Sequence, residues 1–509
     1  MMCDRRATVS FMRSILHPPL RGFYLPALAL LATLFLATSC SEEKKAETAD
    51  VIILQSGRMR GNVYPLQLQS MASLQHYQYL GGYVKQVREE AAKTGTKVLV
   101  VDLGDSLTGS FATHVTGSEN MTTFFNEVGY NAIFLSNLDN SVTPEILAKL
   151  KMPVLNPFQN AAGQPATEGT TFGTKLDLGG LPVYLLANFY GDVSSSQFPD
   201  RFPTKFGTTP TDVTPVRDYS KTLAALGERK PGSLTLLSWM KFESPKDPPK
   251  DFLQTLNQLK ISAILAHRIY GGKEKDAWSA SDFDKWEPPV SLNIIRNNGG
   301  FFIARLDLKR DGDRWKVLDH QLPPMTINSA QPDQALIASI GRYADAITKA
   351  DTKIGDLPNA VNQPQILLAY MSAMAAVPGT DAVLSSLQSV RASWVKGELR
   401  ASSVYNSLPW TTPIVQITLT PEQFASAVTE LKLAGFQKNG AAGPLTVTTS
   451  EYFGRLIAAK LNLPSDSIHE TAQKSEFDYV IEYLKSHPES AASPSAPTDW
   501  TTSGTTNQP

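Results

Sequence analysis

Two arginines that follow an apolar run are the first residues whose types and spacing could do chemistry. The run "VIILQ" reads as a buried strand, and the loop "SGRMRGN" comes directly after it, with one residue between Arg58 and Arg60. A loop after a strand is a common place for an active site. Arginine carries a permanent charge and five donors but no lone pair. The pair could therefore hold an anion, and neither residue could ligate a metal ion.

Carboxylates and one histidine follow the next strands along the chain. Asp102 and Asp105 lie in and after "VLVVDLG", Asp139 follows "AIFLS", and His267 ends "SAILAH". A carboxylate and a histidine together could do acid–base work, although nothing in the sequence pairs them. A second possibility is that Asp105 only neutralises the arginines.

The elements that must position these residues alternate between strands and helices from 51 to about 310. Seven apolar runs read as strands, at 51–54, 98–104, 132–136, 183–189, 234–239, 262–267 and 301–308, with helix-like periodicity at 81–95 and 121–131 between the first three. This alternation predicts an α/β layered domain over 51–325. We expect one linker helix within 326–351 and a smaller α+β domain over 352–485. The Ser/Pro/Thr-rich tail, 486–509, is expected to be disordered.

Composition places the chain among globular proteins and outside nucleic-acid binders. It has 509 residues, 42% hydrophobic and 19% charged, with a net charge of −1. Removing the first 39 residues, which carry four Arg and one Asp, leaves a net charge of about −4, so no basic footprint for nucleic acid remains.

The first 39 residues read as a signal peptide. A basic segment precedes the apolar run "FYLPALALLATLFLA", and "LATSC" ends at Cys40. This resembles the lipobox of bacterial lipoproteins, in which the cysteine is lipidated and becomes the mature N-terminus. Residues 40–50 would be a tether. Ser41 resembles the outer-membrane sorting pattern, so we expect an exported lipoprotein that is anchored to the outer membrane by Cys40 and faces the periplasm.

Motifs in order along the chain resemble the exported 5′-nucleotidase family of metallophosphoesterases, of the bifunctional UDP-sugar hydrolase/5′-nucleotidase type. "IILQSGRMRGNVYPL" resembles "LHTNDxHGNxYPL", and "VVDLGDSLTGS" resembles "LDAGDxxxGS". "EVGYNAIFLSNLDNS" resembles "xxGYDAxxxGNHEFD", and "VRASWVKGELRASSVYNSLPW" resembles "IRAxxxxGxITxxDVYxxLPF". The resemblance spans roughly 51–465. It implies a four-layer αββα sandwich, a linker helix and a smaller α+β C-terminal domain.

The resemblance also implies two divalent metals, whose ligand positions are mostly lost here. The Asp and His of the opening motif fall on Arg58 and Arg60. Asp105 and Asn137 keep the ligand residue types. The catalytic His and three ligand His positions carry Leu138, Trp239, Arg268 and Tyr270. We therefore expect no metal cofactor.

In the second domain, Arg391 matches an arginine that holds the nucleotide in the family. Trp410 keeps an aromatic after Pro409. "SLQS" replaces the family's glycines before Arg391, and a helix at 454–463 stands where a base-stacking segment belongs. Nucleotide specificity therefore does not transfer, and Arg391 could instead be a structural ion-pair partner.

Three functions follow from these residues. The first is a pseudoenzyme that binds a phosphate-type anion through Arg58, Arg60 and Arg268, with Arg391 as a further candidate. The second is an active phosphoester or nucleotide hydrolase of altered mechanism, using Asp105, Asp139 and His267. The third is an envelope scaffold that binds an unknown protein.

Overall fold

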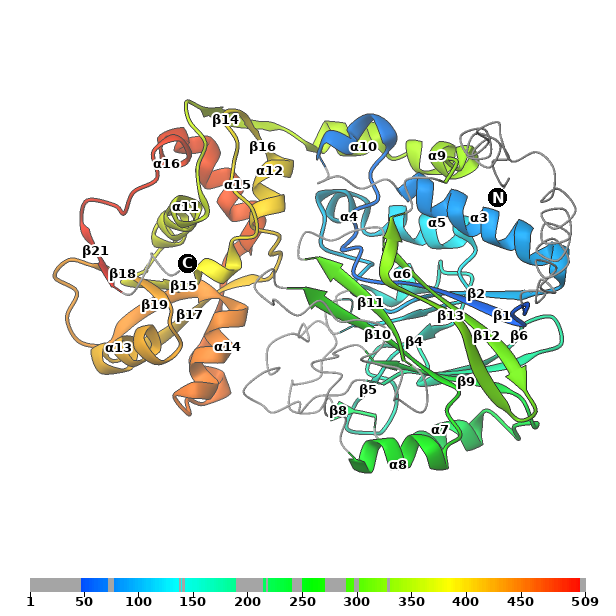
Figure 1. Ribbon diagram of the computed structural model, residues 1–509. Coiled ribbons are helices and arrows are strands. Elements are labelled where there is room, and N and C mark those ends of the chain that lie inside the picture. Colours follow the sequence, from blue (N-terminus) through cyan, green and yellow to red (C-terminus); the bar gives the residue numbers. More distant parts are fainter. Residues whose placement is uncertain are drawn as a thin grey trace, which may run out of the picture. The chain divides into compact units, whose positions relative to one another are not determined.

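The computed structural model describes residues 47–71, 77–136, 139, 142–188, 214–216, 218–239, 250–270, 290–296, 302–326 and 330–503. Cys40, Asn137 and Leu138 lie outside the described residues. Contacts join the described residues from 49 onward into one compact unit. Two lobes, defined by their separate sheets, span residues 51–326 and 353–503 (Figure 1).

The first lobe contains two large sheets. The strand order is β13-β12-β1-β2-β3-β4 in one and β11-β10-β9-β7-β6 in the other. The first sheet comprises β1 (Val51–Ser56), β2 (Lys97–Asp102), β3 (Ala132–Phe134), β4 (Val154–Leu155), β12 (Phe302–Asp311) and β13 (Arg314–Thr326). The second comprises β6 (Gly173–Asp177), β7 (Pro182–Leu186), β9 (Leu234–Trp239), β10 (Ala263–Tyr270) and β11 (Val290–Arg296).

Strand β1 shows how the apolar runs build a layered core. Its side chains alternate between two faces, as those of any strand do. Ile52 and Leu54 pack among residues of helices α3 (Tyr77–Thr94) and α5 (Glu119–Val128). Val51 and Ile53 pack against the second sheet. A strand buried on both faces must be apolar throughout, which explains the unbroken run "VIIL".

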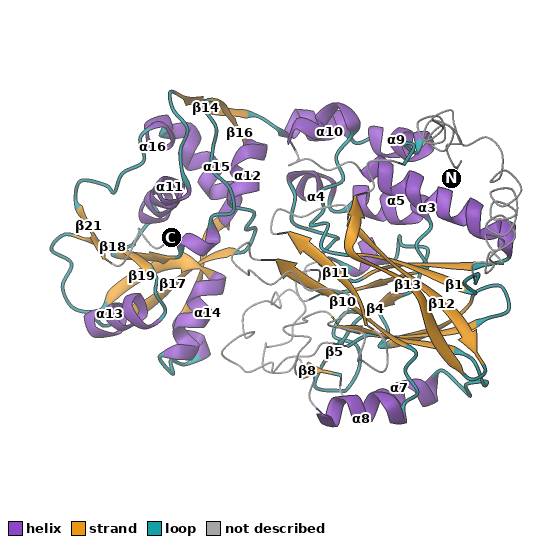
Figure 2. Ribbon diagram, in the orientation of Figure 1, coloured by secondary structure: helices purple, strands orange, loops and turns teal. Residues whose placement is uncertain are grey.

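Helices cover the outer face of each sheet, so the lobe has the order helix, sheet, sheet, helix (Figures 1 and 2). Helices α3 and α5 lie on the first sheet, with α4 (Phe111–Thr116) and α6 (Pro144–Leu147) following β2 and β3. Helices α7 (Tyr219–Ala225) and α8 (Lys250–Gln258) lie by the second sheet. A short helix, η1 (Leu66–Met71), and a small pair, β5 (Phe158–Gln159) with β8 (Thr214–Pro215), complete the lobe. The predicted four-layer αββα sandwich is confirmed.

The second lobe is a six-stranded sheet with helices, in the order β20-β17-β19-β15-β18-β21. Its strands are β15 (Ala382–Ser385), β17 (Pro413–Leu419), β18 (Ala434–Lys438), β19 (Leu445–Ser450), β20 (Ile468–Ser475) and β21 (Trp500–Ser503), and β14 (Lys353–Leu357) pairs separately with β16 (Gly397–Arg400). Its helices are α11 (Gln363–Ala375), η7 (Leu387–Ser389), α12 (Ala401–Ser407), α13 (Pro421–Glu430), α14 (Glu451–Lys460), η8 (Ser465–Ser467), α15 (Glu476–Ser486) and α16 (Pro488–Ala492). This is the predicted α+β class.

The linker differs from the single helix predicted within 326–351. It consists of two helices, α9 (Gln334–Gly341) and α10 (Ala344–Ala350), and Thr326 still belongs to β13. The break falls at Arg342 and Tyr343. Arg342 Nη2 donates to Thr123 Oγ1 at 2.7 Å, and the Tyr343 hydroxyl donates to the Glu119 carbonyl at 3.1 Å. These contacts with α5 interrupt a sequence whose periodicity alone would continue as one helix.

The tail is also more ordered than predicted. The chain forms α16 after residue 487, and then β21, which pairs antiparallel with β18 over Gly435–Lys438. Ala491 is buried, and Ser372 Oγ donates to the Ser495 carbonyl at 3.0 Å. The composition predicted disorder because the segment has little apolar content of its own, but an open sheet edge supplies backbone partners for it.

An aromatic cluster joins the lobes. His114 of α4 lies 5.1 Å from Tyr405 and 5.0 Å from Phe477, measured between ring centroids. Phe111 lies 6.1 Å from Tyr405. These are ordinary separations for stabilising aromatic pairs.

Among the described residues, no helix has the length and apolar character needed to cross a bilayer.

Candidate functional site

The loop after β1 presents both arginines in an uncommon backbone conformation. Arg58 has φ 54° and Arg60 has φ 49°, in the left-handed region that side chains other than glycine rarely adopt. Hydrogen bonds to the loop after β2 hold this conformation. Arg58 N donates to Gly104 O at 2.7 Å, Arg60 N to Asp105 O at 2.9 Å, and Gly61 N to Ser106 O at 2.9 Å. The two loops therefore run side by side at the carboxyl ends of two parallel strands.

Both arginines contact one carboxylate. Arg58 Nε lies 3.3 Å from Asp105 Oδ2, and Arg60 Nε lies 3.7 Å from the same oxygen. Arg58 and Asp105 are 5% and 8% exposed. Asp105 also has a left-handed backbone, with φ 55°. Strained residues of this kind tend to cluster where a structure holds a functional arrangement.

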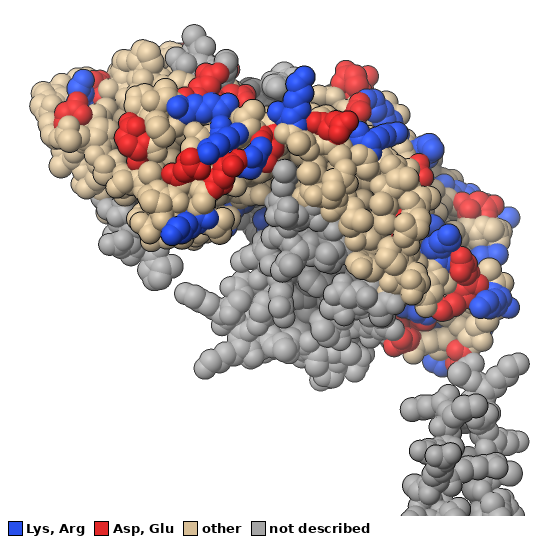
Figure 3. Space-filling model, turned by 90° about the horizontal axis from the view of Figure 1, so that it is seen from above, with Lys and Arg blue, Asp and Glu red and all other residues tan. Residues whose placement is uncertain are grey.

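The Arg58 guanidinium is influenced by the charges of Arg60, Asp105 and Arg391. Burial, and then repulsion by Arg60 and Arg391, lower the pKa of Arg58 to about 10, although Asp105 opposes the shift. Arg58 Nη1 is buried and makes no hydrogen bond to the described residues. On the face visible in Figure 3, by contrast, basic and acidic side chains are interspersed. This buried guanidinium therefore has a donor without an acceptor among the described residues.

Asp102 lies beneath the same two loops and is completely buried. It accepts hydrogen bonds from Ser56 Oγ at 2.8 Å, Gly104 N at 2.9 Å and Ser106 Oγ at 3.1 Å. Met59 N in turn donates to Ser106 Oγ at 3.1 Å. Burial raises the pKa of Asp102 to about 7, against the effect of these hydrogen bonds. Its carboxyl group connects the two loops and does not reach an open surface.

Asp139 follows the end of β3, and its carboxylate accepts hydrogen bonds from four backbone amides and one hydroxyl. Burial, and then the charge of Asp105, raise the pKa of Asp139 to about 6, so it is ionised at pH 7. Its oxygens are committed to donors of the chain. This arrangement is poor for the acid–base role considered from the sequence.

Of the other positions that carry metal ligands in the family motifs, one is packed in the core and the others have side chains outside the described part. Trp239 is 4% exposed and packs with Leu237, Ile264 and Ala266 in the core beside the second sheet. Arg268 lies on β10, but its side chain, like those of His267 and Tyr270, lies outside the described part. A contact between Arg268 and Asp105 therefore stays a prediction.

The described residues do not fit a dinuclear metal centre. Two positions carry arginines, which have no lone pair to donate, and both guanidiniums contact the one retained carboxylate. Within the described ranges, no group of three or more His, Cys, Asp or Glu side chains could hold a metal ion.

In the second lobe, Arg391 stacks on an aromatic ring. Its Cζ lies 4.8 Å from the centroid of the Trp410 ring, a cation–π distance. Trp410 Nε1 donates to Ser389 O at 2.8 Å, and Arg391 N donates to Ser407 O at 2.8 Å. Together with its influence on the pKa of Arg58, this geometry makes Arg391 part of the charge environment of the site.

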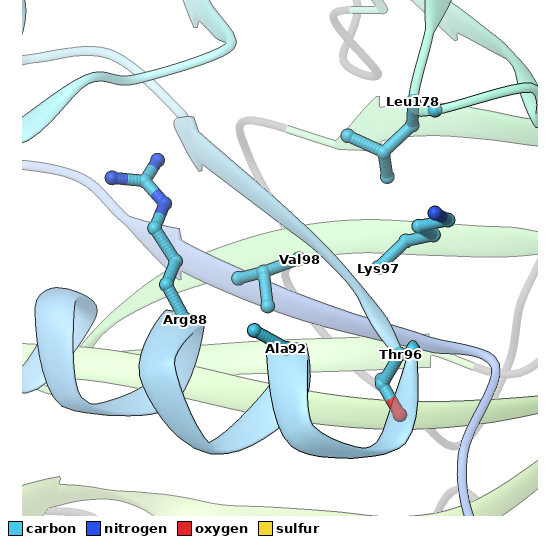
Figure 4. A pocket seen from close by; sticks show the side chains of 8 residues that line it. Arg88, Ala92, Thr96, Lys97, Val98 and Leu178 are labelled. Atoms are coloured by element: carbon cyan, nitrogen blue, oxygen red, sulfur yellow. The ribbon is translucent and has the colours of Figure 1, made fainter.

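A separate surface pocket lies at the opposite end of β2. Arg88 and Ala92 on α3, with Thr96, Lys97, Val98 and Leu178, line it (Figure 4). Arg88 donates to the carbonyls of Val128 and Gly129 at 2.6 and 2.5 Å, so it caps the C-terminus of α5. This pocket is structurally separate from the arginine site.

Comparisons with known proteins identify the fold of this chain through its similarity to solved structures. No family model and no curated protein matches the sequence. A 5′-nucleotidase precursor from Thermus thermophilus is 13% identical, with 86% of this chain and 96% of that chain covered and a TM-score of 0.56. A putative 5′-nucleotidase from Staphylococcus aureus, in complex with alpha-ketoglutarate, is 13% identical, with 85% and 96% covered and a TM-score of 0.59. This chain has the two-domain 5′-nucleotidase fold.

The 5′-nucleotidase from Candida albicans matches similarly, at 11% identity, 86% and 98% coverage and a TM-score of 0.57. The resemblance inferred from motifs is thus confirmed for the fold. Identities this low do not carry activity. Within this 5′-nucleotidase fold, the arginine site departs from the ligand set implied by the family motifs.

Proposed function

We propose that this chain binds a phosphate-type oxyanion at Arg58 and Arg60 and does not hydrolyse it. Arg58 carries the proposal. It is only 5% exposed, shares the Asp105 carboxylate with Arg60, and has a buried Nη1 with no acceptor among the described residues. The Asp105 carboxylate carries one negative charge and contacts both guanidiniums. An oxyanion would supply acceptors and charge, and arginine's planar fork suits it.

Hydrolysis by a two-metal mechanism is not expected from these residues. The mechanism requires metal ions that activate a water and stabilise the phosphate. Arginines at two ligand positions would repel a dication and cannot bind it. A bound anion would be oriented by guanidiniums and kept from bulk water, without a described group placed to attack it.

Isothermal titration calorimetry of the full-length chain with inorganic phosphate, and separately with sulfate, tests the site. We expect 1:1 binding that falls at least tenfold in Arg58→Gln and Arg60→Gln. The control is Arg305→Gln. It removes another arginine paired with a carboxylate, since Arg305 makes two bonds to Asp307 at 2.7 and 2.8 Å on β12. Absence of binding to the unaltered protein, or an equal loss in the control, would refute the proposal.

Carboxylates belong in the same titrations. The Staphylococcus aureus structure contains alpha-ketoglutarate, a dicarboxylate. Competition would show whether this compound and sulfate share one site, and their dissociation constants would show whether the site prefers a planar or a tetrahedral oxyanion.

An active hydrolase of altered mechanism is the alternative function. Assays against nucleotides and a chromogenic phosphate ester with Mn²⁺ should show no turnover. Turnover that disappears in Asp105→Ala would overturn the proposal of an inactive protein, because a contaminating enzyme would not respond to that substitution.

We also propose that the protein is exported and held to a membrane by a lipid on Cys40, with an envelope protein as a further possible partner. The motif "LATSC" supports lipidation, and the Thermus thermophilus relative is described as a precursor. Fractionation tests this: the unaltered chain should sediment with membranes, and Cys40→Ser should not. Equal sedimentation of both would refute lipid anchoring.

A further inference from the structure

A buried carboxylate, that of Asp139, accepts hydrogen bonds from the loop that carries Asp105. Asp139 is 1% exposed. Its Oδ2 accepts from Asp105 N at 2.6 Å and from Ser136 N and Oγ, both at 3.0 Å. Its Oδ1 accepts from Ser106 N at 3.1 Å and Leu107 N at 2.9 Å. A carboxylate offers about four lone-pair directions, so Asp139 is saturated by the chain.

These bonds fix the loop that carries Asp105. Three consecutive amides, from Asp105 to Leu107, point at one carboxylate, and such charge-assisted bonds are stronger than neutral ones. Asp105 has φ 55°, which a residue other than glycine keeps only when the surrounding structure holds it. The bond from its own amide to Asp139 is the shortest of the five. The direction of the Asp105 side chain thus depends on Asp139.

The fixed loop then positions both arginines. The carbonyls of Gly104, Asp105 and Ser106 accept from Arg58 N, Arg60 N and Gly61 N. The connection therefore runs from Asp139 through the amides of one loop, and through the carbonyls of that loop to the backbone of the next. A change at Asp139 would reach Arg58 and Arg60 by loop geometry alone.

We propose that Asp139 is the positioning residue of the arginine site, and that it sets anion affinity by holding Asp105, Arg58 and Arg60 in register. This inference rests on the proposed anion binding. It assigns Asp139 no contact with the anion and no proton transfer. The substitution Asp139→Asn keeps the shape but replaces one acceptor oxygen with an NH₂ group facing amide donors.

The test measures sulfate affinity by calorimetry, because sulfate does not change protonation between pH 6 and 8. We expect Asp139→Asn to weaken sulfate binding at least tenfold. Ser136→Ala removes a single donor to Asp139 and should weaken binding two- to fivefold, which keeps the test open if Asp139→Asn does not fold.

The matched control is Asp351→Asn. Asp351 is also 1% exposed and accepts a backbone amide, that of Ser402, at 2.7 Å, but it contacts neither loop of the site in the hydrogen bonds described. Its substitution should lower the melting temperature and change sulfate affinity less than twofold. A parallel loss of affinity in this control would mean that Asp139 acts only through general stability, and would overturn the inference.

A spectroscopic signature separates positioning from stability. The side-chain Nε–Hε resonances of Arg58 and Arg60, assigned with Arg58→Lys and Arg60→Lys, report the geometry of the ion pairs in the absence of sulfate. They should shift in Asp139→Asn and stay in place in Asp351→Asn. Unchanged resonances and wild-type affinity in Asp139→Asn would overturn the inference and leave the anion site standing. No sulfate binding by the unaltered protein would refute the anion site, and this inference with it.

Discussion

Replacing Asp105 by Asn should destabilise the protein and make its stability depend on an added anion. Asn keeps the shape of the side chain and tolerates a left-handed backbone better than most residues, so the φ of 55° adds little strain. The substitution therefore removes mainly the charge. Arg58, which is buried, and Arg60, which is partly buried, would then lose the carboxylate that both of them contact.

The magnitude follows from the two ion pairs. At an effective dielectric constant of about 20, attraction at 3.3 and 3.7 Å is roughly 5 and 4.5 kcal/mol. Desolvation of all three groups and repulsion between the arginines offset most of this. Removing one partner of a buried pair typically costs about 3–5 kcal/mol. At about 2.1 cal/mol/K of unfolding entropy per residue, the first lobe should melt roughly 5–9 °C lower.

Sulfate should restore part of the loss in Asp105→Asn. A ligand present at about 100 times its Kd stabilises the folded state by about 2.7 kcal/mol. Differential scanning calorimetry, with sodium chloride at matched ionic strength as reference, measures the recovery. Asp307→Asn is the matched control, since Asp307 pairs with Arg305 on β12 and is only 13% exposed at its side chain.

Two results would refute this reasoning. If Asp105→Asn melts at the wild-type temperature without sulfate, the arginines do not depend on Asp105 for neutralisation. If sulfate raises the melting temperatures of Asp105→Asn and Asp307→Asn equally, the effect is general salting-out and not occupation of the site.

Three further predictions concern pH and the tail. Burial raises the pKa of Asp102 from 3.8 to about 7. Its contribution to the free energy of unfolding is therefore complete below about pH 4 and is lost as pH rises through 7. When stability is measured by urea unfolding across this pH range, Asp102→Asn should remove up to about 4 kcal/mol of the decline. Burial lowers the pKa of His114, so protonation favours unfolding, and His114→Phe should lessen the stability lost as pH falls through about 6.5. A chain ending at His487 should melt several degrees below one ending at Ser503, because it loses α16 and β21; equal melting temperatures would contradict a structural role for the tail.

Much of the fold was predictable because its signals are local. The seven apolar runs form strands β1, β2, β3, β7, β9, β10 and β12, and the two periodic segments form α3 and α5. A strand buried on both faces must be apolar throughout, and a helix on one face must repeat its apolar residues. Both requirements produce a pattern of apolar residues within one short stretch of the sequence, where it can be recognised.

The errors arise where distant contacts override local pattern. The linker breaks at Arg342 and Tyr343 because their side chains bond to α5, more than 200 residues earlier. The tail becomes a strand because β18 has an open edge. Neither contact can be predicted from the amino-acid composition of the segment itself.

The site divides in the same way. Sequence reasoning identified Arg58, Arg60 and Asp105, but it treated Asp139 as a possible catalytic group. Asp139 instead accepts amides from residues 105–107, 32 to 34 positions away. The only signal available in the sequence is that Asp139 lies three residues after the predicted strand 132–136, and this does not distinguish a buried acceptor from an acid.

By itself, the sequence determined which chemistry the strand ends can carry. Arginine has no lone pair in any conformation, so a metal ligand set that includes Arg58 and Arg60 is excluded whatever the fold. Only the tertiary structure decided what the charges do. Arg58 and Asp105 are 47 residues apart in the chain, and they meet at 3.3 Å because β1 and β2 are parallel neighbours that end at the same edge of a sheet. Donors and charges belong to residue types, whereas distances, burial and the resulting pKa shifts belong to the packing of loops that the chain order does not reveal.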